Sequence, residues 1–155
     1  FEHMKIRKYR FEDAEAHAEI HKKSVRKIAS KDYSDKIIEA WSDREPESSP
    51  LDEEKERFVA EKDGQIIGFS DFNKETNELS GLYVKPGYTG RKVGSKLLQK
   101  VEKLAKKKGL EKLWCKSTTT ARGFYEEHGW TVLEETVHEV KDVEMKVFRM
   151  EKELC

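Results

Sequence analysis

The sequence predicts an α+β fold with one central mixed β-sheet of about seven strands and about four helices, and three local patterns carry this prediction. Two β-type stretches flank Asp63-Gly64, a residue pair typical of a tight hairpin turn. Val93, Leu97 and Val101 recur at the spacing of an amphipathic helix. A last pair of β-type stretches surrounds Lys141-Asp142. Strands and helices thus follow one another without regular alternation, which favours the α+β class.

The first part of the chain predicts one strand and two helices. Alternation predicts the strand over residues 5–9, and the helix that follows has its apolar face formed by Ala14, Ala18, His21, Val25 and Ile28. Ser34 or Asp35 is the expected N-cap of a second helix that runs through Trp41. Prolines, serines and acidic residues predict a loop over residues 42–56.

The second part is mostly of β type. The predicted strands cover residues 57–61, 65–73, 78–84, 110–116, 131–140 and 145–152. The central helix begins near Val93 and ends at Gly109, a typical terminating residue. A shorter helix is expected over residues 119–127.

Composition narrows the class of protein. A chain of 155 residues without a long Pro/Gly/Ser-rich stretch indicates a single domain over residues 4–155, and Phe1-Glu2-His3 are interpreted as a remnant of expression. The 31 basic residues balance 31 acidic ones, which argues against a general nucleic-acid binder. No apolar stretch of about 20 residues and no signal peptide is visible, so we expect a cytoplasmic protein with no membrane partner. The two cysteines lack metal-ligand spacing, so no metal is expected.

The stretch from Leu82 to Leu98 is the most informative part of the chain. It predicts an apolar strand, a tight turn with glycines and the first turn of a helix, and helix N-termini bind phosphate through free backbone N–H groups. Gly90 and Gly94 would allow a diphosphate to approach the backbone closely. The charges near this turn come from Arg91, Lys92 and Lys96.

Residues 64–154 resemble the GCN5-related N-acetyltransferase (GNAT) superfamily. The strand end Val84-Lys85-Pro86 and the turn Thr89-Gly90-Arg91-Lys92-Val93-Gly94 resemble its first signature. Residues 118–130, with Phe124-Tyr125 at their centre, resemble its second signature, and residues 148–152 resemble its closing strand. Two departures stand out, because Lys92 replaces a usual glycine and Thr89 replaces a common Arg or Gln.

The resemblance implies a three-layer α/β arrangement with a mostly antiparallel sheet, and transfer of an acetyl group from acetyl-CoA to an amine. Backbone amides of the turn would hold the diphosphate, and the strand before it would pair with the pantetheine arm. The implied cofactor-binding residues are Leu82, Tyr83, Val84, Thr89, Gly90, Arg91, Lys92, Val93, Gly94 and Ser95.

The resemblance also implies two catalytic residues. Tyr125 is the expected acid that protonates the leaving thiolate, and the alternative is a core tyrosine that packs beside Phe124. Glu78, six residues before Val84, is a candidate general base that acts directly or through water. The alternative for Glu78 is a solvated carboxylate at a strand end.

Other patterns have both a functional and a structural interpretation. A lysine stripe on the central helix could bind phosphates or nucleic acid, or could be a solvated face; it comprises Lys92, Lys96, Lys100, Lys103 and Lys107. His17 and His21 have a spacing that suits metals, but a packed histidine or one at the acceptor site is the favoured interpretation, because His21 falls on the apolar face. The acidic segment 43–56 is interpreted as a charged loop that could attract a cationic acceptor, and Cys115 as a core residue.

The predicted function is acetyl-CoA-dependent N-acetylation by direct transfer in a ternary complex. A non-catalytic acyl-CoA-binding module and a nucleic-acid-associated protein remain as alternatives. The acceptor is left open among small amines, antibiotics, amino acids, polyamines and protein amines. Dimers are common among similar proteins, so a homodimer is one expected assembly.

Overall fold

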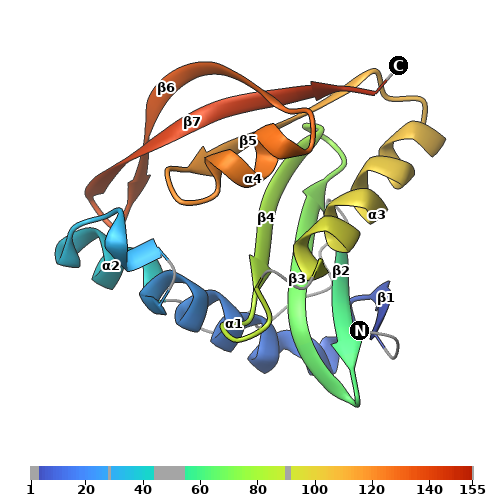
Figure 1. Ribbon diagram of the computed structural model, residues 1–155, viewed down its shortest axis with the longest axis horizontal. Coiled ribbons are helices and arrows are strands. Elements are labelled where there is room, and N and C mark those ends of the chain that lie inside the picture. The colour runs from blue at the N-terminus through green and yellow to red at the C-terminus, as the bar shows by residue number, and fades with distance from the viewer. Residues whose placement is uncertain (1–3, 28, 44–54, 90–91, 155) are drawn as a thin grey trace.

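The computed structural model describes residues 4–27, 29–43, 55–89 and 92–154, and in this part of the chain seven strands and four α-helices follow the predicted order (Figure 1). The strands are β1 (Met4–Lys8), β2 (Lys55–Lys62), β3 (Gln65–Asn73), β4 (Glu78–Val84), β5 (Lys112–Thr118), β6 (Thr131–Val140) and β7 (Val143–Glu153). The helices are α1 (Ala14–Lys27), α2 (Asp35–Ser42), α3 (Val93–Lys107) and α4 (Arg122–Glu127), with short 3-10 helices η1 (Phe11–Asp13) and η2 (Ala29–Lys31) on either side of α1. The predicted α+β fold is confirmed.

All seven strands belong to one sheet in the order β1-β2-β3-β4-β5-β7-β6. Among these strands β4 and β5 form the parallel pair, and the other neighbours are antiparallel. The connection between β4 and β5 is α3, as parallel strands require a crossover. None of the helices in the described residues is long and apolar enough to cross a membrane.

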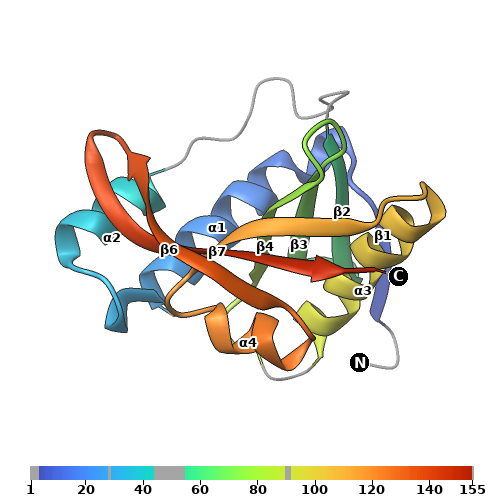
Figure 2. The ribbon, with the colours of Figure 1, turned by 90° about the horizontal axis from the view of Figure 1, so that it is seen from above.

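The helices form a layer on each face of the sheet (Figure 2). On one face α3 and α4 cover the main core, where Leu97 and Val101 pack with Phe72. On the other face Ile20 of α1 packs against Phe69 of β3. The predicted apolar stripe of α3 is therefore the side that meets the sheet.

The turns follow the local sequence signals. Asp63 and Gly64 both have positive φ, as the tightest hairpin turns require, and Lys141 and Asp142 repeat this geometry between β6 and β7. Of the two expected caps of α2, Ser34 is the N-cap, because its Oγ accepts a hydrogen bond from Ile37 N at 3.3 Å. These confirmed turns and caps depend on a few neighbouring residues only.

Several predicted boundaries are wrong by two or three residues. The last helix was expected from residue 119 but begins at Arg122, because Thr118 Oγ1 accepts a hydrogen bond from Ala121 N at 3.1 Å and holds a turn there. Strand β5 is shifted from the predicted 110–116 to Lys112–Thr118. Pairing with β7 decides this register, since Lys112 lies opposite Glu153 and Thr118 opposite Val147.

Strands β4 and β5 separate almost at once. Their register contains the single pair Glu78–Trp114, supported by a hydrogen bond from Trp114 N to Asn77 O at 3.3 Å. Beyond this point β4 stays paired with β3, while β5 stays paired with β7 (Figure 1). The sheet therefore opens along the side of β4 that faces β5.

Candidate active site

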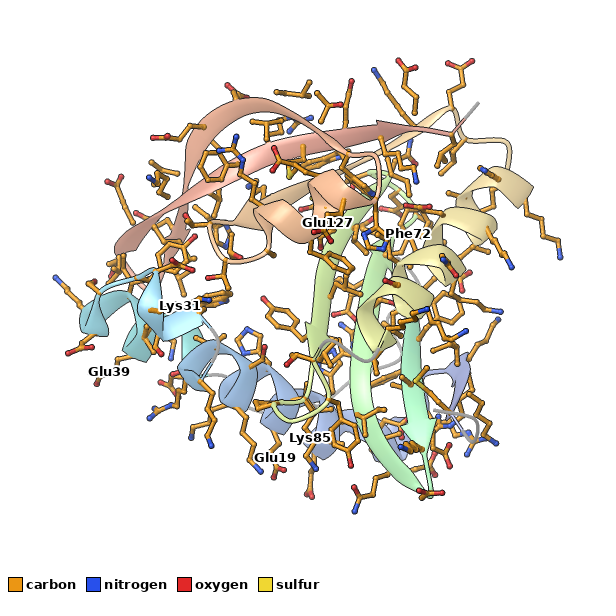
Figure 3. All side chains as sticks on the ribbon, viewed as in Figure 1. Glu19, Lys31, Glu39, Phe72, Lys85 and Glu127 are labelled. Atoms are coloured by element: carbon orange, nitrogen blue, oxygen red, sulfur yellow. The ribbon has the colours of Figure 1, made fainter. Side chains whose placement is uncertain are left out.

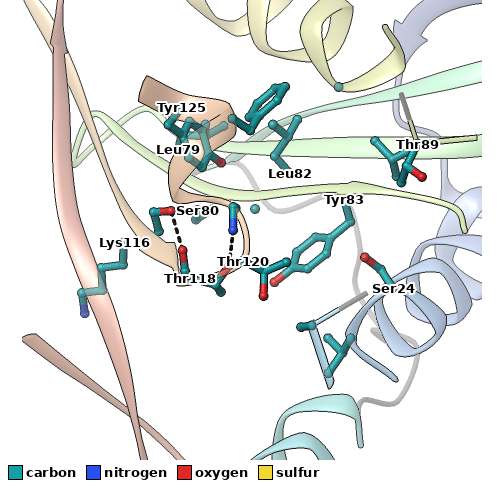
Figure 4. A pocket seen from close by; sticks show the side chains of 18 of the residues that line it. Ser24, Leu79, Ser80, Leu82, Tyr83, Thr89, Lys116, Thr118, Thr120 and Tyr125 are labelled. Atoms are coloured by element: carbon teal, nitrogen blue, oxygen red, sulfur yellow. Dashed lines mark hydrogen bonds between the residues drawn. The ribbon is translucent and has the colours of Figure 1, made fainter. Parts of the chain in front are cut away.

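A cavity of about 200 Å³ lies where β4 and β5 separate. Its walls come from β4, from α1 and α2 on one side, and from β5, α4 and the loop between them on the other (Figure 4). The opening of the sheet thus becomes a channel that leads from the first turn of α3 to the α1–α2 layer.

The backbone of β4 forms one edge of this channel. Leu82, Tyr83 and Val84 line the cavity, as the sequence predicted for the strand next to the turn. Their register partners are all on β3, and among the described residues β4 pairs with β5 at Glu78 alone. An extended ligand with amide groups can pair with such an edge.

The first turn of α3 forms the next part of the wall. Gly94 and Thr89 line the cavity, whereas Gly90 and Arg91 lie outside the described residues. Val93 is buried in the core, so its backbone N–H is the group left for a ligand. The Ser95 hydroxyl lies 2.8 Å from His128 Nε2, which links this turn to the end of α4.

Lys92 has an unusual backbone conformation. It is the N-cap residue of α3 with φ 65° and ψ 11°, the left-handed region that glycine adopts most easily, and its side chain is exposed. The structure therefore explains why the resembling turns have glycine at this position.

Tyr125 is a cavity residue and a core residue at once. It is 6% exposed, lines the cavity from α4, and packs against Phe124 and Trp130 with ring centroids 5.3 Å apart in each pair. Burial raises the pKa of its hydroxyl well above the ordinary value, with further contributions from Cys115 and Tyr83. Tyr125 is consequently protonated at neutral pH and able to donate.

Glu78 lies at the closed end of the strand separation. The cavity walls include its neighbours Leu79 and Ser80 but, among the described residues, not Glu78 itself. Burial raises the pKa of its half-buried carboxyl, and this rise is only partly offset by Lys116, Lys55 and Arg149. A carboxyl with a raised pKa can accept a proton.

The comparisons with known proteins agree with this geometry. Residues 20–154 match the family described as "Acetyltransferase (GNAT) domain". The chain belongs to the GNAT acetyltransferase family. It is therefore an acetyltransferase with acetyl-CoA as its cosubstrate, as the resemblance in the sequence implied.

This GNAT chain is similar in sequence or structure to the following proteins. The spermidine N(1)-acetyltransferase of Thermoplasma acidophilum is 31% identical, and the match covers 96% of each chain. The crystal structure of the PaiA N-acetyltransferase from the same organism, in complex with coenzyme A, has a TM-score of 0.78 at 30% identity and covers 97% of this chain and 98% of that one. A GCN5-related N-acetyltransferase structure from Rhodopseudomonas palustris has a TM-score of 0.86 at 27% identity, with 97% and 95% covered.

The two histidines of α1 have structural partners in this GNAT fold. His17 is buried, its Nε2 lies 3.2 Å from Asp71 Oδ2, and its ring stacks on Phe69 at 3.7 Å between centroids. His21 is buried against Trp41 and Tyr83. Among the described residues no group of three or more metal-ligating side chains is present, and packing is the interpretation that these contacts support.

The remaining sequence candidates of the GNAT chain divide between core and surface. Cys115 is 1% exposed, and burial together with Glu78 raises the pKa of its thiol to about 12, so it is a core residue, as expected. The lysines of the stripe on α3 all have exposed side chains. Most of the acidic segment 43–56 lies outside the described residues.

Sequence reasoning missed the opposite wall of the channel. Ser24, Trp41, Thr118 and Thr120 line the cavity; only the two threonines belong to a predicted motif, and the sequence assigned them no role. Trp41 was the easiest of these cavity residues to predict from the sequence, because it is a large aromatic residue near the end of a short helix and precedes an acidic segment. Its neighbours across the cavity come from segments far away in the sequence, so the local pattern could not predict them.

Proposed function

We propose that the protein transfers the acetyl group of acetyl-CoA directly to a primary amine of a polyamine, with both substrates bound in one ternary complex. The observation that carries this proposal is the cavity between β4 and β5, which is lined both by the first turn of α3 and by the α1–α2 layer. Two substrates that enter from opposite ends would meet beside Tyr125.

The residues present fit acetyl-CoA, which supplies the acetyl group as a reactive thioester. The first turn of α3, where Gly94 lines the cavity, offers backbone N–H groups and the positive end of the helix dipole to the diphosphate. Leu82, Tyr83 and Val84 offer the edge of β4 that faces away from β3 to the pantetheine amides. These assignments agree with the cofactor residues inferred from the sequence.

Tyr125 is proposed as the acid of the reaction. As the C–N bond forms and the C–S bond breaks, Tyr125 donates its hydroxyl proton to the departing thiolate and regains a proton from solvent. The raised pKa supports this role because it keeps the hydroxyl protonated.

Glu78 is proposed as the base that removes the proton of the amine through a water. Its raised pKa supports this role, since a carboxylate with an ordinary pKa is a weaker base. Its position beside Leu79 would place the water at the cavity wall.

The buried cysteine favours direct transfer over a covalent acetyl-enzyme. Cys115 is nearly inaccessible and its thiol pKa is about 12, so little thiolate forms at neutral pH. Tight alignment of amine and thioester in the channel would then supply most of the rate acceleration.

The polyamine acceptor is proposed from the relative named spermidine N(1)-acetyltransferase, which matches almost the whole chain. The channel wall formed by α1, α2 and β4 contributes Trp41 and Tyr83, two aromatic residues suited to an alkyl ammonium ion. The proposed substrate class therefore has support from both the comparison and the cavity.

The decisive experiment measures thiol release from acetyl-CoA with spermidine, amino acids, an aminoglycoside and a lysine peptide, with mass spectrometry of the products. Acetylation of spermidine at a rate well above the other amines is the expected result. Initial velocities at several concentrations of both substrates should give intersecting lines, whereas parallel lines would contradict direct transfer. Tight CoA binding without acetylation of any amine would favour the non-catalytic module.

A further inference from the structure

An aromatic wall closes the end of the cavity next to α1 and α2. We use this name for His21, Tyr33, Trp41 and Tyr83. Ring centroids are 6.0 Å apart for His21 and Trp41, 5.9 Å for Tyr33 and Trp41, and 6.3 Å for Trp41 and Tyr83. Trp41 is thus the central member and contacts the other three rings.

Two rings of the aromatic wall face the cavity. Trp41 and Tyr83 line it and are only partly buried, although both pack on the apolar cluster of Val25, Ala29 and Ile38. In Figure 4 the Tyr83 ring extends from β4 into the space between Ser24 and Thr120. Ring surface that borders a cavity attracts a cation, and more strongly where water is excluded.

A carboxylate is held at the same end of the cavity. Thr120 lines the cavity, and its Oγ1 donates a hydrogen bond to Asp32 Oδ2 at 2.7 Å. The Asp32 side chain is exposed to solvent and is linked to the cavity through Thr120, which lines it. This contact joins the segment before α2 to the loop before α4.

Tyr33 fixes the position of this segment. Its hydroxyl accepts a hydrogen bond from Thr119 N at 2.8 Å and donates one to Lys146 O at 2.7 Å. The segment that carries Asp32 is thereby tied to both the α4 loop and β7. Asp32 is consequently held in a defined position behind Thr120, next to Tyr33 of the aromatic wall.

We propose that Trp41, Tyr83 and Asp32 bind a second, protonated amine of the acceptor while its first amine reaches the thioester beside Tyr125. This inference rests on the proposed function and deepens it, because it assigns the residues that select a diamine over a monoamine. The rings attract the ammonium and pack on the alkyl chain, and Asp32 supplies the opposite charge.

The one lysine among the cavity residues does not oppose this assignment. Lys116 lines the cavity with its stem, but its side chain is exposed and its ammonium points away from Tyr83 and Thr120 (Figure 4). Its charge lies on the side of Glu78, whose carboxyl pKa it lowers against the effect of burial. The cation site and the lysine are therefore on different sides of the cavity.

The test compares hexamethylenediamine with aminohexanol, which differ only in the remote amine. Binding of each to the protein saturated with CoA is measured by calorimetry, and KM for each is measured with acetyl-CoA. We expect the diamine to bind about tenfold more tightly, a difference equal to about 1.4 kcal/mol. Trp41→Leu should abolish most of this preference, and Trp41→Phe should keep it.

Asp32→Asn provides an independent variant, because asparagine can still accept the Thr120 hydrogen bond while the charge is lost. We expect it to lower the diamine preference about threefold. Glu39→Gln is the matched control, since it removes the same charge from the outer side of α2 and should leave the preference unchanged (Figure 3). Thermal unfolding and CoA affinity report whether each variant is folded.

The outcomes separate this inference from the proposed function. Equal binding of diamine and aminohexanol, or an equal loss for both in Trp41→Leu and Asp32→Asn, would overturn the inference even if spermidine is acetylated. Absence of spermidine acetylation, together with diamine binding that depends on Trp41 and Asp32, would overturn the proposed function and support the cation site. If Trp41→Leu does not fold, an unchanged preference in Asp32→Asn is sufficient to overturn the inference.

Discussion

Gly94 in the first turn of α3 lies directly against the ring of Phe124 on α4, so that a Cβ at position 94 would stand 3.3 Å from two ring carbons. The same Cβ would lie 3.6 Å from Cγ2 of Val84. The glycine turn and the Phe-Tyr segment, which the sequence presents as separate motifs, are therefore neighbours in space. Their contact closes the cavity wall on the side of α3.

Gly94→Ala is expected to weaken CoA binding without destabilising the fold. Alanine gains up to about 1 kcal/mol of helix propensity, which offsets the small shift required of the Phe124 ring. The methyl group borders the cavity, so we expect the Kd for CoA to rise about tenfold, or about 1.4 kcal/mol. Calorimetry and thermal unfolding measure the two effects.

Gly123→Ala is the matched control for this substitution, because nothing lies within 4 Å of the Cβ it would add on α4. It should leave the Kd for CoA unchanged. Unchanged CoA affinity in Gly94→Ala as well would show that the first turn of α3 does not contact CoA.

Replacement of Lys92 separates backbone strain from charge. Lys92→Gly should raise the free energy of unfolding by about 1 kcal/mol relative to Lys92→Ala, since only glycine adopts φ 65° without cost. Both variants lose the ammonium, so both should bind CoA more weakly than the parent protein does. This loss of affinity should be larger at low salt than at high salt, because salt screens the attraction in the parent. Chemical denaturation measures the free energy of unfolding, and CoA titrations measure the affinity. Equal stability of the two variants would show that the backbone at position 92 is not strained.

Tyr125→Phe should lower kcat about 100-fold and change the Kd for CoA less than about threefold, because the lost hydroxyl acts on the leaving sulfur. Steady-state kinetics with the best acceptor and direct CoA titration give the two numbers. The raised pKa predicts no loss of activity from Tyr125 ionisation up to its ordinary value of 10.0. A variant that keeps the parental kcat would exclude Tyr125 as the acid.

Glu78→Gln should reduce activity and increase stability at neutral pH. The folded-state pKa of Glu78 lies above its ordinary value of 4.5, so the folded protein binds this proton more tightly than the unfolded chain. The resulting stabilisation is present below about pH 4.5 and is lost as the pH rises through the folded-state pKa. The glutamine variant avoids this loss, so its advantage should appear at pH 7 and vanish near pH 4.5.

The parent protein and Glu78→Gln should also differ in how their activity depends on pH. The base must be ionised, so the parental rate falls as the pH decreases through the raised pKa, and Glu78→Gln should lack this acidic limb. Rate profiles and thermal unfolding across the same pH range provide the data. An unchanged acidic limb in the variant would assign it to another group.

The sequence predicted those features that depend on neighbouring residues. Asp63-Gly64 and Ser34 act within one turn, and the apolar stripe of α3 reflects the helix period alone. Tyr125 could be proposed because its motif is contiguous, and the structure brings it to the cavity. The start of α4 was predicted too early because Thr118 stabilises a competing turn.

The cavity itself follows from long-range pairing. Nothing in β4 or β5 alone predicts that they share the single pair Glu78–Trp114, because the positions of the two strands are set by their pairing with β3 and β7, which lie far away in the sequence. The aromatic wall likewise unites α1, α2 and β4, and its rings meet only once both helices pack on the sheet.

The sequence by itself determined the turns, the helix faces and the two motifs of an acetyltransferase, since each arises from hydrogen bonds and periodicity within a short segment. Only the tertiary structure decided where β4 leaves β5, how Gly94 meets Phe124 and which residues line the cavity. The physical reason is that these contacts join segments far apart in the chain. Their geometry is fixed by the packing of the whole sheet and its two helical layers.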